Sequence, residues 1–226
     1  MPKVGVVLSG CGVMDGSEIH EAVCVLLALS QARVDYQCMA PDATQMHVVN
    51  HLSNEPAKGE SRNVLTESAR IARGEITALG EVDVAGYDAF IFPGGFGAAK
   101  NLCTFAIDGP DCTVHPHVAR LIEEAHNARK VLAFICIAPV IAAKVLGKST
   151  AAKLTIGDDP ETAAAITSMG CEHVVCPVDE AIVDEANRVV SSPAYMKATS
   201  VAEVYESVKS TVDAMLTLAA APAAYA

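Results

Sequence analysis

Cys136 stands at a junction that can present a reactive thiol. The buried-strand pattern Val131–Ile135 runs directly into a helical pattern that begins near Ala138, with no spacer between them. This layout is typical of a nucleophile elbow. The amides and dipole at the start of a helix stabilise negative charge, and Pro139 fits the first helical turn. The sequence therefore predicts a thiolate at Cys136, and a buried, inert cysteine is the alternative.

A glycine loop after another strand pattern offers donors for an oxyanion. The apolar segment 88–92 is followed by Gly94 and Gly95. In a parallel sheet the loops after the strands gather at the carboxyl edge, so we expect this loop near Cys136. Amides of Gly95 and Ile137 would then stabilise an oxyanion formed by attack on a carbonyl. A turn that only needs glycine is the alternative interpretation.

Glu21 is the candidate proton carrier. Glu18 and Glu21 lie one helical turn apart at the start of a predicted helix. A carboxyl group buried beside a thiolate has a raised pKa and can carry a proton. Acidic residues in a first turn often only complement the helix dipole, and Glu18 fits that role. Glu21 lies deeper along the predicted apolar stripe, which consists of Ile19, Ala22, Val23, Leu26, Leu27 and Ser30.

Alternating strand and helix patterns must position these residues. They predict an α/β fold: a doubly wound, mostly parallel sheet flanked by helices, as in a flavodoxin-like three-layer sandwich. The predicted strands are 3–9, 34–40, 88–92, 131–135 and 171–176, and the main helices are 117–129, 138–146, 160–169 and 200–218. The segments 181–184 and 188–191 predict a C-terminal β-hairpin.

One domain over residues 1–220 is the economical organisation, with a flexible tail at 221–226. The segment 43–86 is too long for an ordinary connection. It contains a predicted helix at 62–73 between short β-like pieces at 47–50 and 75–79. We interpret it as an insertion that helps to shape a site.

The composition favours a small-molecule or protein partner. The net charge is −11 and the 16 Lys and Arg residues are scattered, which excludes a nucleic-acid or anionic-membrane footprint. The first apolar run, Val4 to Leu8, is too short for a membrane span and begins too early for a signal peptide. We therefore expect a cytoplasmic protein whose eight cysteines are mostly reduced.

Metal and dinucleotide sites are disfavoured. Cys171, His173 and Cys176 do not converge on one face of a strand. The loop 10–16 lacks the third-glycine spacing of a dinucleotide fingerprint. We expect no metal and no cofactor. Cys11 in this loop could act as a resolving thiol for Cys136. The favoured interpretation is that it only fills space in the loop.

Four segments carry a family resemblance: 9–21 (SGCGVMDGSEIHE), 93–102 (PGGFGAAKNL), 136–139 (CIAP) and 193–196 (PAYM). Over nearly the whole chain they resemble the glyoxalase-like, enhancing lycopene biosynthesis protein family. That family lies within the class I glutamine amidotransferase-like superfamily, which includes glyoxalase III and intracellular-protease-like proteins.

The resemblance implies roles for particular residues. Cys136 matches the elbow cysteine, Glu21 the carboxyl partner of the glyoxalase III branch, and Gly95 an oxyanion-hole glycine. The segment 62–65 belongs to the family's insertion pattern, and a homodimer is implied. The candidate substrate-pocket residues are Gly94, Cys11, Arg62, Asn63 and Asn101.

One departure from the family pattern limits the chemistry. Related glyoxalases and amidotransferases carry a histidine downstream of the cysteine, where this chain has 153–159 (KLTIGDD). A Cys-His-Glu triad and glutamine hydrolysis are therefore not expected. The leading hypothesis is a slow, cofactor-independent glyoxalase (a glyoxalase III-like lyase) that converts small 2-oxoaldehydes, glyoxal to glycolate. The alternatives are a redox sensor that uses sulfenic acid at Cys136, and a protein-interaction member with weak or no turnover.

Overall fold

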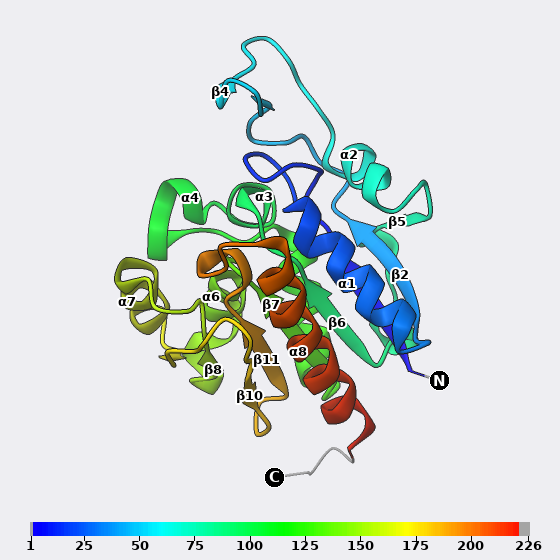
Figure 1. Ribbon diagram of the computed structural model, residues 1–226, viewed down its shortest axis with the longest axis vertical. Helices are drawn as coiled ribbons and strands as arrows, with labels where there is room; N and C mark the ends of the chain where they lie inside the picture. Colours follow the sequence, from blue (N-terminus) through cyan, green and yellow to red (C-terminus); the bar gives the residue numbers. More distant parts are fainter. Residues whose placement is uncertain (1, 222–226) are drawn as a thin grey trace.

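A seven-stranded sheet forms the centre of the molecule. The computed structural model describes residues 2–221, and the sheet order is β10-β11-β7-β6-β1-β2-β5 (Figure 1). All neighbouring pairs are parallel except β10 and β11. The strands are β1 (Lys3–Val7), β2 (Asp35–Ala40), β5 (Ile76–Ala78), β6 (Ala89–Phe92), β7 (Val131–Ile135), β10 (Ile182–Asp184) and β11 (Val189–Ser192). The predicted doubly wound α/β class and the C-terminal hairpin are confirmed.

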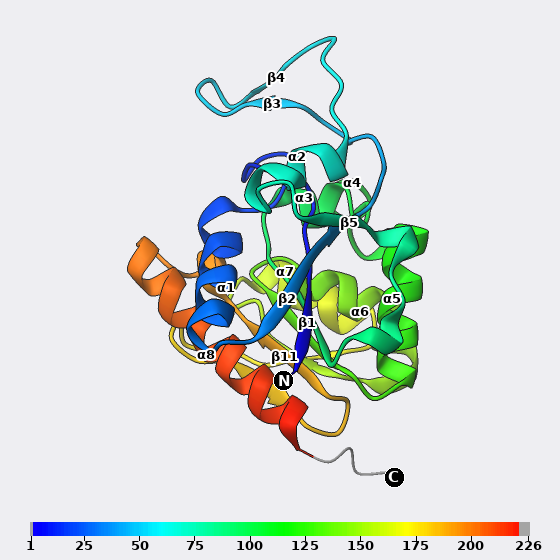
Figure 2. The same ribbon diagram turned by 90° about the vertical axis from the view of Figure 1, so that its right-hand side faces the viewer.

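Helices cover both faces of this sheet. One face carries α1 (Ile19–Gln31), α2 (Val64–Ile71) and α8 (Val201–Ala220), and the other carries α5 (Pro116–Asn127) and α6 (Pro139–Thr150), with α7 (Pro160–Ser168) packed on α6 (Figure 2). Short helices and 3-10 turns complete the connections. At the carboxyl edge these are α3 (Phe96–Lys100), α4 (Phe105–Asp108), η1 (Leu79–Glu81), η3 (Gly109–Asp111) and η4 (Ala194–Met196), whereas η2 (Val84–Gly86) leads into β6 at the amino edge.

Side chains that alternate along the strands divide the core in two. In β6, Phe90 and Phe92 pack toward α5 and α6, whereas Ala89 and Ile91 pack toward α1 and α8. β7 repeats the pattern, and the rings of Phe92 and Phe134 stack at 4.7 Å. Continuous apolar runs are needed because both faces of these strands are buried.

The phase predicted for the first helix is wrong. Ile19, Val23 and Leu27 are 42%, 48% and 45% exposed, while the buried face includes Glu21 and Val25. The sequence offers apolar residues on both sides of α1, so periodicity alone does not select the face that packs. Glu21 is part of the packed face, as its place along the helix predicted, although the apolar residues that surround it are not those expected.

Two other segments differ from prediction, and a third is not tested. β5, assigned to the insertion, is the edge strand of the central sheet beside β2. The strand predicted at 171–176 shortens to β9 (Glu172–His173), which pairs with β8 (Lys153–Leu154) in a separate two-stranded sheet. The tail predicted at 221–226 lies, apart from Ala221, outside the described residues.

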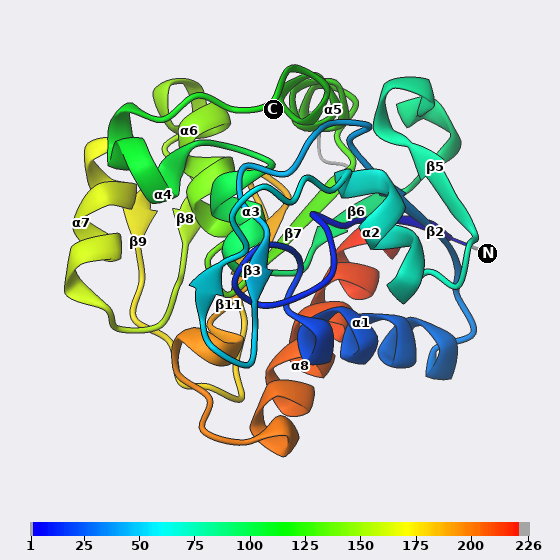
Figure 3. The same cartoon turned by 90° about the horizontal axis from the view of Figure 1, so that it is seen from above.

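The rest of the insertion is a hairpin that projects beyond the carboxyl edge. β3 (Val49–Asn50) and β4 (Glu55–Pro56) form it, and it lies over the loop 10–16 when the molecule is viewed from above (Figure 3). Figure 2 shows that it extends away from the sandwich. The predicted helix at 62–73 is α2, capped by Asn63, whose side chain accepts a hydrogen bond from the N–H of Thr66.

Candidate active site

Cys136 occupies a tight turn between β7 and α6. Its φ is +61°, in the left-handed region that residues other than glycine seldom adopt. Its own N–H donates to the carbonyl of Ser192 at 2.9 Å, which ties the turn to β11. Pro139 is in the first turn of α6 and Ala138 precedes it. The junction thus has the strained strand-to-helix geometry of an elbow, with the side chain 7% exposed.

The carboxyl group of Glu21 lies against this cysteine and is fully buried. One of its oxygens accepts the N–H of Gly94 at 2.8 Å, and the other accepts the N–H of Tyr195 at 3.2 Å. The thiol of Cys136 and this carboxyl group both border Gly94, and each group shifts the pKa of the other. Glu18 caps α1 and accepts the N–H of Glu21 at 2.8 Å, so the two glutamates predicted in one turn have different partners.

Burial dominates the electrostatics of this pair. It raises the pKa of Glu21 to about 7, with a further increase from the negative charge of Glu18, and the hydrogen bonds from Tyr195, Cys136 and Gly94 only partly offset it. The pKa of Cys136 lies well above its ordinary value, first because of burial and then because of the charge of Glu21.

The prediction of a low-pKa thiolate at Cys136 is therefore wrong. The N–H groups of Gly95 and Ile137 do hydrogen-bond the sulfur and lower its pKa, as expected at the start of a helix. Full burial beside a carboxylate outweighs these two donors. The resting sulfur therefore keeps its proton.

The glycine loop after β6 needs its glycines for close packing. A Cβ on Gly94 would lie 2.5 Å from the Cβ of Cys136 and 2.7 Å from a carboxyl oxygen of Glu21. Gly95 has φ +94°, and a Cβ there would lie 2.3 Å from the backbone nitrogen of Glu18. Because the N–H of Glu18 also donates to the carbonyl of Gly94 at 3.0 Å, this loop docks directly onto the start of α1.

Tyr195 is a site residue without a role in the sequence interpretation. Its backbone holds Glu21, and its hydroxyl lies 2.7 Å from Nδ1 of His20. The carboxylate of Glu18 is 3.9 Å from the same nitrogen. β11 pairs in parallel with β7, with Ser192 opposite Ile135, so the residues after β11 must lie beside Cys136. If the last strand had been predicted as the parallel neighbour of β7, the residues after it, including Tyr195, would have been expected beside Cys136.

Two of the predicted pocket residues, Asn101 and Cys11, belong to or support the loop 10–16. The side-chain amide of Asn101 donates to the carbonyls of Ser9 and Asp15 at 2.8 Å each, and its oxygen accepts the N–H of Met46 at 2.9 Å. Cys11 is half-buried beside Glu67 and Asp15, and burial is the main reason why its pKa is raised. Gly94 is the pocket candidate that contacts both Cys136 and Glu21.

Arg62 and Asn63 lie at the base of the hairpin. Arg62 pairs with Glu60 at 3.2 Å and Glu67 at 3.6 Å, and it lines a cavity of about 450 Å³ within the hairpin. Asn63 caps α2 and donates to Asp42 at 2.7 Å. These contacts hold the insertion in place, and a role in substrate binding stays a prediction.

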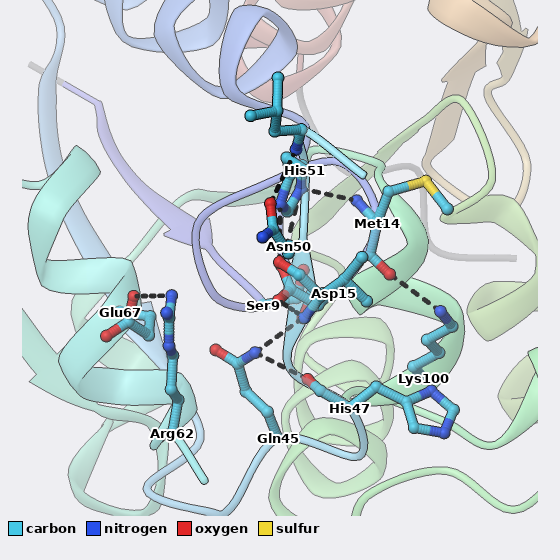
Figure 4. A network of polar contacts seen from close by, with 12 residues as sticks. Ser9, Met14, Asp15, Gln45, His47, Asn50, His51, Arg62, Glu67 and Lys100 are labelled. Atoms are coloured by element: carbon cyan, nitrogen blue, oxygen red, sulfur yellow. Dashed lines mark hydrogen bonds and ion pairs between the residues drawn. The ribbon is translucent and has the colours of Figure 1, made fainter. Parts of the chain in front are cut away.

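Asp15 anchors the hairpin to the loop 10–16 (Figure 4). Its buried carboxylate accepts the N–H of Val49 at 2.7 Å and lies 3.8 Å from Nε2 of His51. That nitrogen also accepts the N–H of Met14 at 3.2 Å. Lys100 donates to the carbonyl of Met14 at 2.8 Å from the opposite side. The insertion therefore covers the loop that packs on the Gly94–Gly95 turn.

Neither a metal cluster nor a membrane helix is found in the described part of the chain. Within residues 2–221, no three His, Cys, Asp or Glu side chains are grouped so that they would hold a metal ion. No helix in the same range is long and apolar enough to cross a membrane.

The parallel sandwich, the elbow cysteine and the glycine loop place the chain in the class I glutamine amidotransferase-like class. Drosophila melanogaster DJ-1beta shares the fold, with a TM-score of 0.56 over 96% of this chain and 93% of that one, at 16% identity. No protein-family model matches the chain.

Closer relatives narrow the class to a family. Human glutamine amidotransferase-like class 1 domain-containing protein 3, mitochondrial, is 49% identical over 96% of this chain and 83% of its own length. ES1 protein, mitochondrial, of Danio rerio is 36% identical over 86% and 77%. An isoprenoid biosynthesis protein with amidotransferase-like domain from Ehrlichia chaffeensis has a TM-score of 0.90 at 37% identity, over 96% of this chain and 99% of that one. The chain belongs to this ES1-like family, which confirms the family resemblance.

The relatives' names overturn the cytoplasmic prediction. The human, rat and zebrafish relatives are all named mitochondrial. The prediction rested on the early apolar run, which forms β1 and so reports on the fold rather than on the compartment.

Proposed function

We propose that this chain is a cofactor-independent glyoxalase III-type enzyme that converts glyoxal and similar small 2-oxoaldehydes into 2-hydroxy acids. The observation that carries the proposal is the fully buried carboxyl of Glu21, beside the thiol of Cys136 and with a pKa near neutrality. General acid–base catalysis is most effective when the pKa of the group is close to the working pH.

In the first step the Glu21 carboxylate takes the thiol proton as the sulfur of Cys136 adds to an aldehyde carbon. A raised thiol pKa fits this order, because the proton leaves only as the sulfur–carbon bond forms. The amides of Gly95 and Ile137, which hydrogen-bond the resting sulfur, would stabilise the oxyanion beside it. Return of the proton to the oxygen gives a hemithioacetal.

In the second step Glu21 removes the hydrogen from the carbon bound to sulfur as a proton, which gives an enediol, and delivers it to the neighbouring carbon. The hydroxyl proton on the first carbon moves to the oxygen of the second. The first carbon is oxidised to a thioester and the second is reduced to an alcohol, so no external electron acceptor is needed. Water then cleaves the thioester, which releases glycolate and restores the thiol. Cys136 is only 7% exposed, which favours a substrate of two or three carbons.

We expect slow turnover and no glutaminase activity. The stretch 153–159 holds no histidine, so the second proton-transfer group of related enzymes is missing. Loss of such a group typically costs about a hundredfold or more in rate. The names of the relatives support the amidotransferase-like superfamily and state no activity.

The test is conversion of glyoxal to glycolate by the wild type, Cys136→Ala and Glu21→Gln. Cys24→Ala is the matched control, because Cys24 is also 7% exposed but lies along α1. We expect glycolate formation to fall on the order of a hundredfold or more in both site variants and to persist in the control. Thiol-free buffer and product detection separate turnover from trapping of aldehyde by cysteines.

Other outcomes would move the alternatives forward. Stoichiometric loss of glyoxal without glycolate, together with reversible oxidation of Cys136, would favour a redox sensor. Turnover that survives in Cys136→Ala would contradict the mechanism, and a physiological role that also survives would favour protein interaction.

Two further properties are carried as proposals. The family resemblance supports a homodimer, which light scattering of the purified chain would test. The names of the relatives support a mitochondrial location, which fractionation of expressing cells would test.

A further inference from the structure

A pair of cysteines, Cys103 and Cys112, lies away from Cys136, on the face of the sheet covered by α5 and α6. Cys103 pairs with Val114 in an isolated antiparallel bridge, and the N–H of Thr104 donates to the carbonyl of Thr113 at 2.9 Å. In this register Cys112 lies two residues from Val114 and on the same face as Cys103. The loop 103–114 therefore brings two thiols together.

The two thiols are in contact inside the core. Cys103 and Cys112 are 2% and 1% exposed, and each side chain is the leading cause of the shift in the other's pKa. The thiol of Cys103 also lies 3.4 Å from the carbonyl of Ala98. Lys144 donates to the carbonyl of Pro110 at 2.8 Å, which places a positive charge beside the loop that carries Cys112.

These contacts make the two thiols unequal. The hydrogen bond from Cys103 and the charge of Lys144 lower the pKa of Cys112 to about 7, despite burial. The same hydrogen bond and burial raise the pKa of Cys103. All eight cysteines lie in the described range, and Cys112 alone has a pKa below its ordinary value, whereas that of Cys136 is raised.

We propose that Cys103 and Cys112 are a dithiol–disulfide couple, oxidised by low-molecular-weight disulfides. The Cys112 thiolate attacks one sulfur of the disulfide, which forms a mixed disulfide and releases one thiolate. Cys103 then loses its proton to water and attacks the sulfur of Cys112, which releases the second thiol. Two protein thiols are oxidised by two electrons and one small disulfide is reduced to two thiols. This proposal is independent of the glyoxalase proposal.

The loop around the pair can open locally. α4 has no buried residue, and Ile107 is 64% exposed. A cavity of about 630 Å³ lies between part of this loop and α7, with Phe105, Ile107 and Pro110 on one side and Ala165 on the other. Segments with few buried contacts open at low free-energy cost. Opening of 104–111 would expose Cys112 while the sheet stays folded.

The chain offers a direct readout. Trypsin cleaves after Lys100 and Arg120, so one peptide, 101–120, contains both cysteines, and another, 131–144, contains Cys136 alone. The folded wild type is equilibrated in mixtures of reduced and oxidised glutathione, quenched with N-ethylmaleimide and digested. We expect peptide 101–120 to lose both labels together and to become lighter by two hydrogens. Peptide 131–144 should stay labelled in the same mixtures.

Matched variants give the order of attack. Cys103→Ser should stop at a glutathione adduct on Cys112, and Cys112→Ser should leave Cys103 labelled. Thermal unfolding of each variant shows whether it is folded before oxidation. A wild-type peptide 101–120 that keeps both labels in oxidised glutathione would overturn the proposal, as would oxidation of Cys136 before this pair or pairing of either cysteine with another one.

Discussion

At the scale of single residues, Glu21 and Cys136 show how burial decides protonation. The Glu21 carboxyl accepts two backbone N–H groups, which would keep an exposed carboxylate ionised. Its pKa still rises to about 7, because no water solvates it and Glu18 adds a like charge. The elbow of Cys136 supplies two donors as well, and they are likewise outweighed. A protonated thiol beside a carboxyl group of raised pKa therefore replaces a free thiolate.

Glu21 should make stability depend on pH. The unfolded chain releases this proton near 4.5, whereas the folded protein holds it to about 7, so the contribution is fully present below pH 4.5 and is lost as the pH rises through about 7. The difference between the folded and unfolded pKa values of Glu21 corresponds to roughly 3 kcal/mol of unfolding free energy. Urea unfolding of the wild type and Glu21→Gln across this range checks it. A constant difference between the two proteins would contradict the raised pKa.

At the scale of elements, four carboxyl ends assemble the site. Four strands stand next to one another in the sheet, in the order β11-β7-β6-β1. The loops that follow them therefore converge at one edge. The loop after β6 touches the start of α1 so closely that no Cβ fits at Gly95. Backbone contact, rather than side-chain packing, sets the distance between Glu21 and Cys136.

Gly95→Ala should therefore be costly, and Gly74→Ala is its matched control. Both glycines have positive φ, +94° and +89°, but a Cβ on Gly74 would meet nothing within 4 Å. We expect Gly95→Ala to lower the free energy of unfolding by about 1–3 kcal/mol more than the control, through overpacking. Chemical denaturation of the two variants gives the comparison. Equal losses would show that the close approach at Gly95 carries no energy.

At the scale of the whole molecule, contacts distant in sequence hold the hairpin over the site edge. Asp15, from the loop after β1, binds Val49 and approaches His51 in the hairpin. Asn101, from the loop after β6, binds the backbone on both sides of Gly10 to Gly12 and also holds Met46. The insertion is thus fastened to the same loops that carry the candidate site.

Asp15→Ala should loosen this hairpin without unfolding the sandwich. Loss of a hydrogen bond of about 1 kcal/mol predicts roughly fivefold faster amide exchange, here over residues 47–58. Glu60→Ala is the control, because Glu60 is an exposed partner of Arg62 at the hairpin base. Hydrogen exchange detected by mass spectrometry measures the amide exchange rates of both variants. Unchanged exchange in Asp15→Ala would mean that the hairpin is held by other contacts.

The sequence alone was sufficient for the α/β class, the hairpin at 181–191, the turn at Cys136 and the glycines beside it. These features depend on local rules: apolar runs for buried strands, a strand that meets a helix without a spacer, and glycines where backbones approach. The packed face of α1, the place of β5 and the role of Tyr195 required the tertiary structure, because apolar residues lie on both sides of α1 and strand order is not encoded locally. The protonation states of Cys136 and Cys112 also required the tertiary structure, because a pKa depends on burial and on charges that the fold brings close.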